Sequence, residues 1–136
     1  HQNIKLLLVG TFESELDPLH DSTLNEIESN NNIINVGWQT DVRPYFAISN
    51  VLAFPSYREG FPNVVMQASC MSLPCIVTNI NGCNEIIENN INGLIIPSKD
   101  TNALYEAMEK VLLDKTLRLY LHKNARNLNF QAYFPH

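Results

Sequence analysis

Residues 56–74 read SYREGFPNVVMQASCMSLP and follow a short apolar run, VLAF, at residues 51–54. The apolar run is typical of a buried strand, and the residues from Pro62 onward have apolar side chains at helical spacing. A polar turn containing Glu59 and Gly60 connects the two. A strand, a polar turn and a helix N-terminus in succession can bind phosphate groups, because the first helical turn leaves backbone N–H groups unpaired. We therefore expect both the fold and the site to be organised around this stretch.

Apolar runs like the one before this stretch recur along the whole chain. Besides residues 51–54, strands are expected at residues 4–9, 33–37, 75–78 and 94–97. Helices are expected between them at residues 21–28, 42–48, 62–73, 85–88 and 100–112, with a last helix from about Lys115. Five strands alternating with helices predict an α/β fold, a Rossmann-like doubly wound parallel sheet. Ligands bind such sheets beyond the carboxyl ends of the strands.

Capping residues support the expected helices. Asp21 or Ser22 is expected to cap the first helix, Thr40 or Asp41 the second, and Asp100 or Thr101 the long helix near the end.

Composition restricts the classes of partner. The 136 residues predict a single domain, residues 1–136, and its net charge of -5 argues against binding of nucleic acid by this segment. No apolar run approaches the roughly 20 residues that a membrane span requires. Three cysteines without C-x-x-C spacing indicate free thiols in a reducing cytoplasm rather than disulfides or a zinc site.

The polar residues of the opening stretch are the strongest site candidates. Glu59 can accept hydrogen bonds from sugar hydroxyls, or it can simply neutralise the helix N-terminus, and the residue pattern favours neither reading. Backbone N–H groups of residues 63–65 are expected to face a phosphate group. Gln67 can bridge two hydroxyls, although alone it would be a surface helix residue. A second polar loop, residues 79–85, is expected to converge on the same strand ends, with Gly82 allowing close backbone approach.

Trp38 and Gln39 follow the second expected strand. A flat aromatic ring and exposed backbone groups there could contact a nucleobase. A single tryptophan is also often packed against a neighbouring domain.

At these residues the sequence resembles the C-terminal, nucleotide-sugar-binding domain of the retaining glycosyltransferases of family GT4. These enzymes have the GT-B architecture of two facing Rossmann-like domains. The resemblance covers nearly the whole chain, and it is carried by Leu8-Val9-Gly10, Val36-Gly37, Phe54-Pro55-Ser56, residues 59–65, Pro74, Gly82, Glu85-Ile86-Ile87 and Asn92-Gly93.

The resemblance implies transfer of a sugar from a nucleotide diphosphate sugar with retained anomeric configuration, and no metal or other cofactor. Glu59 matches the first acid of the family's E-x7-E motif and is the implied catalytic residue. Gln67 stands at the position of the second acid, which holds the ribose. The residues implied to bind the donor sugar and diphosphate are Gly60, Phe61, Pro62, Asn63, Val64 and Val65.

Two departures from the family pattern shape the expectations. Gln67 replaces an acid, so it keeps hydrogen-bonding capacity and loses charge assistance. Residues 4–10 look like the family domain's second strand, so the chain is expected to be a fragment without the first βα unit and without the N-terminal acceptor domain. The isolated fragment is therefore expected to be inactive.

The full-length protein is expected to act in polysaccharide or glycolipid synthesis, with an acceptor glycan or glycolipid bound by the missing domain. We expect it in the cytoplasm, and peripheral association with the cytoplasmic face of the membrane is a further expectation. The alternative is a non-catalytic nucleotide- or sugar-binding module, which the replacement at Gln67 favours.

Overall fold

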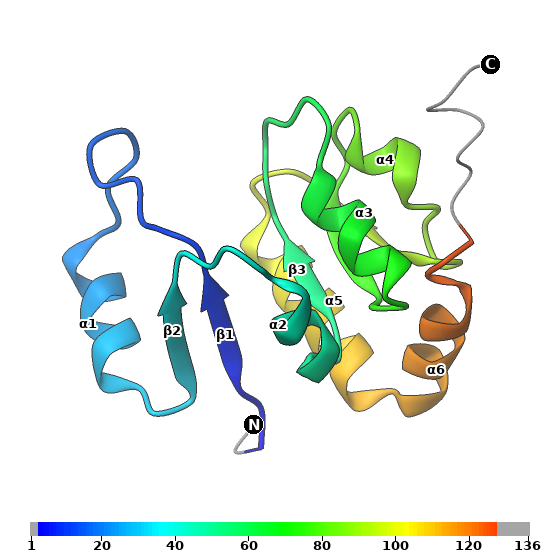
Figure 1. Cartoon of the computed structure of the whole chain (residues 1–136), viewed down its shortest axis with the longest axis horizontal. Helices are drawn as coiled ribbons and strands as arrows, with labels where there is room; N and C mark the ends of the chain where they lie inside the picture. Colours follow the sequence, from blue (N-terminus) through cyan, green and yellow to red (C-terminus); the bar gives the residue numbers. More distant parts are fainter. Residues whose placement is uncertain (1–2, 128–136) are drawn as a thin grey trace. The chain divides into compact units, whose positions relative to one another are not determined.

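Five parallel strands alternate with helices along the chain (Figure 1), which confirms the predicted α/β fold class. The computed structural model describes residues 3–127. In chain order the elements are β1 (Leu6–Val9), α1 (Asp21–Ser29), β2 (Ile33–Gly37), α2 (Arg43–Ile48), β3 (Leu52–Phe54), α3 (Asn63–Cys70), β4 (Cys75–Thr78), α4 (Cys83–Ile86), β5 (Gly93–Ile96), α5 (Thr101–Leu113) and α6 (Lys115–Asn124). The chain divides into two compact units, residues 1–45 and 46–136. One domain over residues 1–136 stays a prediction.

The first unit pairs β1 with β2 in parallel, in a register that places Leu6 opposite Ile33. Helix α1 follows the predicted range, but its predicted cap is wrong. His20 is the N-cap residue and makes no side-chain capping bond, and Asp21 is already the first helical residue. The His20 carbonyl accepts the N–H groups of Thr23 and Leu24, so the helical ladder begins one residue earlier than expected.

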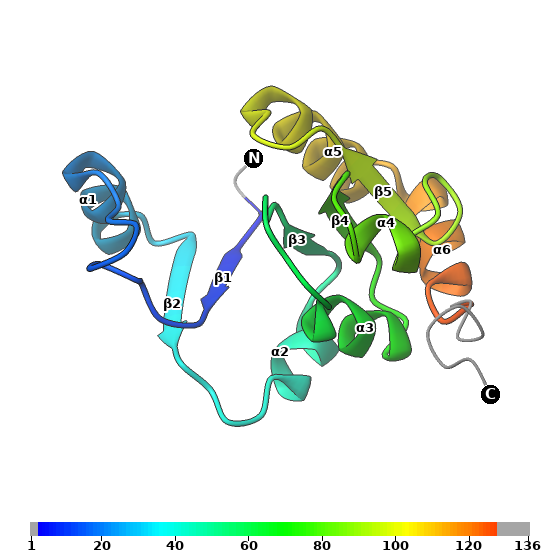
Figure 2. The same ribbon diagram turned by 90° about the horizontal axis from the view of Figure 1, so that it is seen from above.

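The second unit contains a three-stranded parallel sheet in the order β3-β4-β5. Every residue of the central strand β4 is buried, because helices cover both of its faces. Ile76 packs with Leu94 and Ile96 of β5 and with Val111 of α5 in one apolar cluster. Cys75 points to the opposite face, where its Sγ lies 3.9 Å from the Val65 carbonyl of α3. Figure 2 shows α5 and α3 on opposite sides of this sheet.

Capping carboxylates begin the two C-terminal helices. The Asp100 carboxylate accepts the Ala103 N–H at 2.9 Å, as predicted for α5, and Asp114 accepts the Leu117 N–H at 3.0 Å before α6. Asp41 likewise accepts the Arg43 N–H at 3.0 Å ahead of α2. Each bond satisfies an N–H group that the first helical turn cannot pair internally.

Helix α3 ends at Cys70, three residues before the predicted end at Leu73. Ser72 has a φ of 63°, and the flanking bonds run from Ser72 N to Ser69 O at 2.9 Å and from Leu73 N to Ala68 O at 3.0 Å. This pair of bonds is a Schellman motif, which usually has glycine at the left-handed position. Because serine occupies that position here, the sequence has no glycine to indicate the stop.

Candidate functional site

The Glu59 loop, residues 55–62, leads from the carboxyl end of β3 into α3. Glu59 is half-buried, and the Ser56 hydroxyl donates a hydrogen bond to its Oε1 at 2.8 Å. The Thr78 hydroxyl, at the end of β4, donates in turn to the backbone carbonyl of Ser56. Among residues 3–127, the second carboxylate oxygen of Glu59 has no hydrogen-bond partner. One oxygen is thus held by the protein and the other is available to a ligand.

The Gly82 loop, residues 79–82, lies directly against the Glu59 loop. A Cβ atom built on Gly82 would lie 2.9 Å from the Gly60 carbonyl oxygen and 2.9 Å from Pro62 Cδ. This contact confirms that the two predicted polar loops converge beyond the carboxyl ends of β3 and β4. It also explains the glycine, because no side chain fits between the loops.

Backbone amides at the start of α3 are less free than a simple helix N-terminus suggests. The Asn63 N–H donates to the Phe61 carbonyl at 2.9 Å, and the Val65 N–H donates to the Pro62 carbonyl at 3.0 Å. In the described part of the chain the Val64 N–H has no acceptor. Of the three amides predicted to face a phosphate, Val64 is therefore the one left unpaired within the protein.

Space in front of the loop is open at Gly60, where an added Cβ would meet nothing within 4 Å. Pro62 is buried at the base of the turn, whereas Phe61 is 42% exposed. Gln67 is exposed one turn into α3, and its side-chain amide has no partner within residues 3–127. The structure thus brings Glu59, the loop backbone and α3 together within the second unit.

Trp38 and Gln39 lie in the first unit, immediately after β2. The Trp38 side chain is 68% exposed, so within this unit its ring is largely uncovered. The Gln39 side-chain amide donates to the Val36 carbonyl at 2.8 Å, which fixes the turn that carries the tryptophan. Their contact with a nucleobase stays a prediction.

Cys83, which is buried at the start of α4, is the cysteine whose thiol is influenced by the charge of Glu59. Burial, and then the negative charge of Glu59, raise the pKa of Cys83 to about 11. The thiol therefore stays neutral at pH 7 and places no second negative charge beside the Glu59 carboxylate. Cys70, Cys75 and Cys83 are all free cysteines.

A cavity of about 180 Å³ borders the Glu59 loop and is lined by Tyr57, Thr78 and the turn that connects β5 to α5. Lys99, in that turn, places its Nζ 5.0 Å from the centre of the Tyr57 ring, a cation–π distance. Lys99 has a φ of 58°, a conformation that is uncommon for a residue with a side chain. The Glu59 loop is thus contacted from β4, from the Gly82 loop and from the β5–α5 turn.

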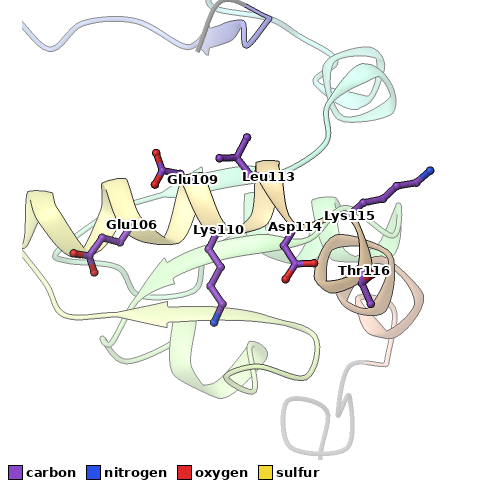
Figure 3. Close-up of a pocket in the computed structure, with 7 residues that line it drawn as sticks. All are labelled: Glu106, Glu109, Lys110, Leu113, Asp114, Lys115 and Thr116. Carbon is purple, nitrogen blue, oxygen red and sulfur yellow. The ribbon is translucent and has the colours of Figure 1, made fainter.

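A larger hollow of about 520 Å³ lies elsewhere, along α5 and the start of α6 (Figure 3). Its lining contains both acidic and basic side chains, including Glu106, Glu109 and Lys110, together with Leu113. None of the site residues predicted from the sequence lines this hollow. Size alone therefore does not identify the site.

Two features bear on metals and membranes. Residues 3–127 contain no group of three or more histidine, cysteine, aspartate or glutamate side chains that could hold a metal ion. None of the helices described is long and apolar enough to cross a bilayer.

Sequence reasoning missed the two hydroxyl residues Ser56 and Thr78. Both are polar residues at or just after the carboxyl ends of predicted strands, and this position could have marked them as site residues. The link between them could not be read from the sequence, because it joins residues 22 positions apart.

Comparison with known proteins identifies close relatives. The family model "Glycosyl transferases group 1" matches residues 1–128. The capsular polysaccharide biosynthesis glycosyltransferase CapM of Staphylococcus aureus is 32% identical over 124 residues, which are 91% of this chain and 32% of CapM. The Escherichia coli UDP-Gal:alpha-D-GlcNAc-diphosphoundecaprenol alpha-1,3-galactosyltransferase is 36% identical over 95 residues, 70% of this chain and 24% of the enzyme.

Among solved structures, Anabaena HepE in complex with UDP and glucose superposes with a TM-score of 0.83 at 19% identity. The match covers 96% of this chain and 37% of HepE, and it shows a shared fold. The chain spans about a third of the length of CapM and about a quarter of the length of the Escherichia coli enzyme.

Proposed function

This chain belongs to the group 1 glycosyl transferases, family GT4, and on that premise we propose that it binds the donor in a retaining glycosyltransferase. The donor is a nucleotide diphosphate sugar, and UDP is the nucleotide we propose. The name of the Escherichia coli relative includes UDP-Gal, and the HepE structure holds UDP and glucose, which supports this choice.

The observation that carries the proposal is that only one of the two carboxylate oxygens of Glu59 is hydrogen-bonded by the described residues. One oxygen is bonded to Ser56 at 2.8 Å, and the other has no partner within the described residues. A carboxylate oriented in this way beside open space can accept hydrogen bonds from sugar hydroxyls. We assign Glu59 to the donor sugar, as its catalytic residue.

The diphosphate is assigned to the turn that follows. The unpaired Val64 N–H and the open space at Gly60 allow an anion to approach the start of α3. The backbone of residues 60–65 contacts sugar and diphosphate in this proposal. Gln67 contacts the ribose, and its free side-chain amide supports that role. Trp38 and Gln39 contact the nucleobase.

The rest of the reaction is assigned outside this chain. We propose that an acceptor glycan or glycolipid is bound outside these 136 residues, which span only a quarter to a third of the two relatives' length. We propose that no metal is required and that the isolated 136-residue chain does not turn over donor. The CapM and Escherichia coli names support a polysaccharide or lipid-linked acceptor. We further propose that the full-length protein works in the cytoplasm, at the membrane surface.

The test uses the full-length protein and release of UDP from UDP-glucose, UDP-galactose and UDP-N-acetylglucosamine. Glu59→Ala is expected to abolish turnover, whereas Gln67→Glu is expected to retain or raise it. Glu106→Ala, an exposed acid in the hollow along α5, is the matched control and should leave turnover unchanged. Unaltered turnover after loss of Glu59 would remove the role assigned to that residue.

A non-catalytic binding module is the second candidate, favoured by the neutral residue at Gln67. Calorimetry of the full-length protein with UDP, GDP, ADP and their sugars separates the two. Binding of a nucleotide sugar without any turnover by the unaltered protein would favour the module. Turnover of a UDP-sugar would exclude it.

A further inference from the structure

The Glu59 carboxylate is bonded by the Ser56 hydroxyl, and the backbone of Ser56 is itself bonded by the Thr78 hydroxyl. Thr78 donates to the backbone carbonyl of Ser56, and the Ser56 hydroxyl donates to Glu59 Oε1 at 2.8 Å. We propose that Ser56 and Thr78 are positioning residues that set the direction of the Glu59 carboxylate for the donor sugar. This inference rests on the proposed function of Glu59.

The Ser56 hydroxyl is suited to orient a carboxylate. A glutamate side chain has several rotatable bonds, so without a partner its carboxylate samples many directions. The Ser56 hydroxyl also lies 3.4 Å from the Arg58 carbonyl, and the shorter contact to Glu59 is the stronger one because its acceptor is ionised. Because Ser56 occupies only Oε1, it restricts the side chain without consuming the oxygen that faces the ligand.

Thr78 provides the fixed end of this arrangement. It is the last residue of β4, is 1% exposed, and lies in a strand that is buried along its whole length. A β-branched side chain has few accessible rotamers, and a residue on a core strand is placed more reproducibly than one on a loop. The orientation of the Glu59 side chain therefore depends on the position of β4 as well as on the loop that carries Glu59.

The other contacts of the Glu59 loop act on its backbone or on other side chains. Gly82 approaches the Gly60 carbonyl, and Lys99 lies over the Tyr57 ring. Among residues 3–127, Ser56 is the hydrogen-bond donor to the Glu59 carboxylate. Loss of the Ser56 hydroxyl should therefore affect the carboxylate while the loop backbone stays held.

The decisive experiment compares turnover of a UDP-sugar with the affinity for UDP alone, in the full-length protein. UDP lacks the donor sugar to which Glu59 is assigned, so a change confined to the Glu59 carboxylate should leave UDP binding intact. Ser56→Ala should lower kcat/KM by about 10–100-fold, the scale expected when a catalytic group is misplaced. Its dissociation constant for UDP, measured by calorimetry, should stay within about twofold.

Variants of Ser56 and Thr78 test the two hydrogen bonds that lead from β4 to the Glu59 carboxylate. Ser56→Thr keeps a hydroxyl and should recover most of the turnover lost in Ser56→Ala. Thr78→Val keeps the packing and removes the hydroxyl, so it should lower turnover by less than Ser56→Ala, and Thr78→Ser should restore it. Ser29→Ala is the matched control, because Ser29 also donates a 2.7 Å hydrogen bond, to the Asn25 carbonyl of exposed α1. It should leave turnover unchanged.

A double-mutant cycle separates positioning from a general effect on folding. Because Glu59→Ala is expected to abolish turnover, the cycle is read from the affinity for the UDP-sugar, measured by calorimetry. In a Glu59→Ala background, Ser56→Ala should cause no further loss of that affinity. A multiplied loss, a parallel loss of UDP affinity, or full turnover by Ser56→Ala while Glu59→Ala is inactive would each overturn this inference alone. Full turnover by Glu59→Ala itself would overturn the proposed role of Glu59 and this inference with it.

Discussion

Replacement of Gly82 by alanine tests whether the contact between the Gly82 loop and the Glu59 loop holds the site together. Gly82 has φ 86° and ψ -57°, and its Cβ would lie 2.9 Å from both the Gly60 carbonyl oxygen and Pro62 Cδ. Alanine therefore introduces two separate costs, one in the backbone and one in packing.

The two costs can be estimated separately. A residue with a side chain in such a sparsely populated conformation costs about 1–3 kcal/mol. Overpacking against backbone and a proline ring adds about 1–3 kcal/mol. Alanine also lowers the entropy of the unfolded chain, which returns about 0.4–1 kcal/mol. We expect Gly82→Ala to lower the free energy of unfolding by about 2–4 kcal/mol.

Three other glycines serve as matched controls. Gly60 would meet nothing within 4 Å, so Gly60→Ala should change stability by at most about 0.5 kcal/mol and weaken donor binding instead. Gly93 carries a clash without a positive φ, its Cβ lying 2.5 Å from the Cys75 carbonyl oxygen. Gly37 carries a positive φ of 69° with open space around it. These variants separate the packing cost from the backbone cost.

The measurement is urea unfolding of the full-length protein, combined with hydrogen exchange of peptides from β4 and α4. Exchange reports local opening of the second unit even if other parts unfold independently. Gly82→Ala should accelerate exchange in α4 and release the Glu59 loop, lowering turnover. Equal stability of Gly82→Ala and Gly60→Ala would refute the reasoning, because it would mean that the two loops are not in contact.

Two further predictions concern titrating groups. The Arg43 side chain bonds Asp41 at 2.8 Å and lowers the pKa of Asp41 from its ordinary value of 3.8 to about 2. The contribution of this pair to stability is thus complete above about pH 4 and is lost as pH falls toward 2. Arg43→Met should return the pKa, followed by NMR, toward 3.8, and an unchanged titration would contradict the pairing. For the thiols, burial raises the pKa of Cys75 to about 12 and that of Cys83 to about 11, whereas Cys70 is exposed. Iodoacetamide at pH 8 should therefore modify Cys70 alone in the native protein and all three cysteines in urea, as read by peptide mass spectrometry, and native labelling of Cys83 would count against its burial.

The five strands and the order of the helices could be predicted from the sequence, because each depends on the spacing of apolar residues within a short segment. Residues 75–78, for instance, are a continuous apolar run closed by Thr78, and this run became the buried strand β4. The boundaries were less secure where usual signals were missing. Serine at position 72 ended α3 in place of glycine, and His20 preceded α1 without a capping bond.

The position of the candidate site also followed from the sequence, because carboxyl ends of parallel strands gather at one edge of a sheet. Its internal geometry did not. Only the tertiary structure decided that Thr78 bonds Ser56, that Ser56 occupies one oxygen of Glu59, and that Gly82 meets Gly60. These contacts join segments about 20 residues apart or select one atom of a side chain, and local periodicity contains neither kind of information. The sequence by itself thus determined the family, the fold class and the loop that carries Glu59, and the packing of neighbouring strands and loops determined how that carboxylate is held.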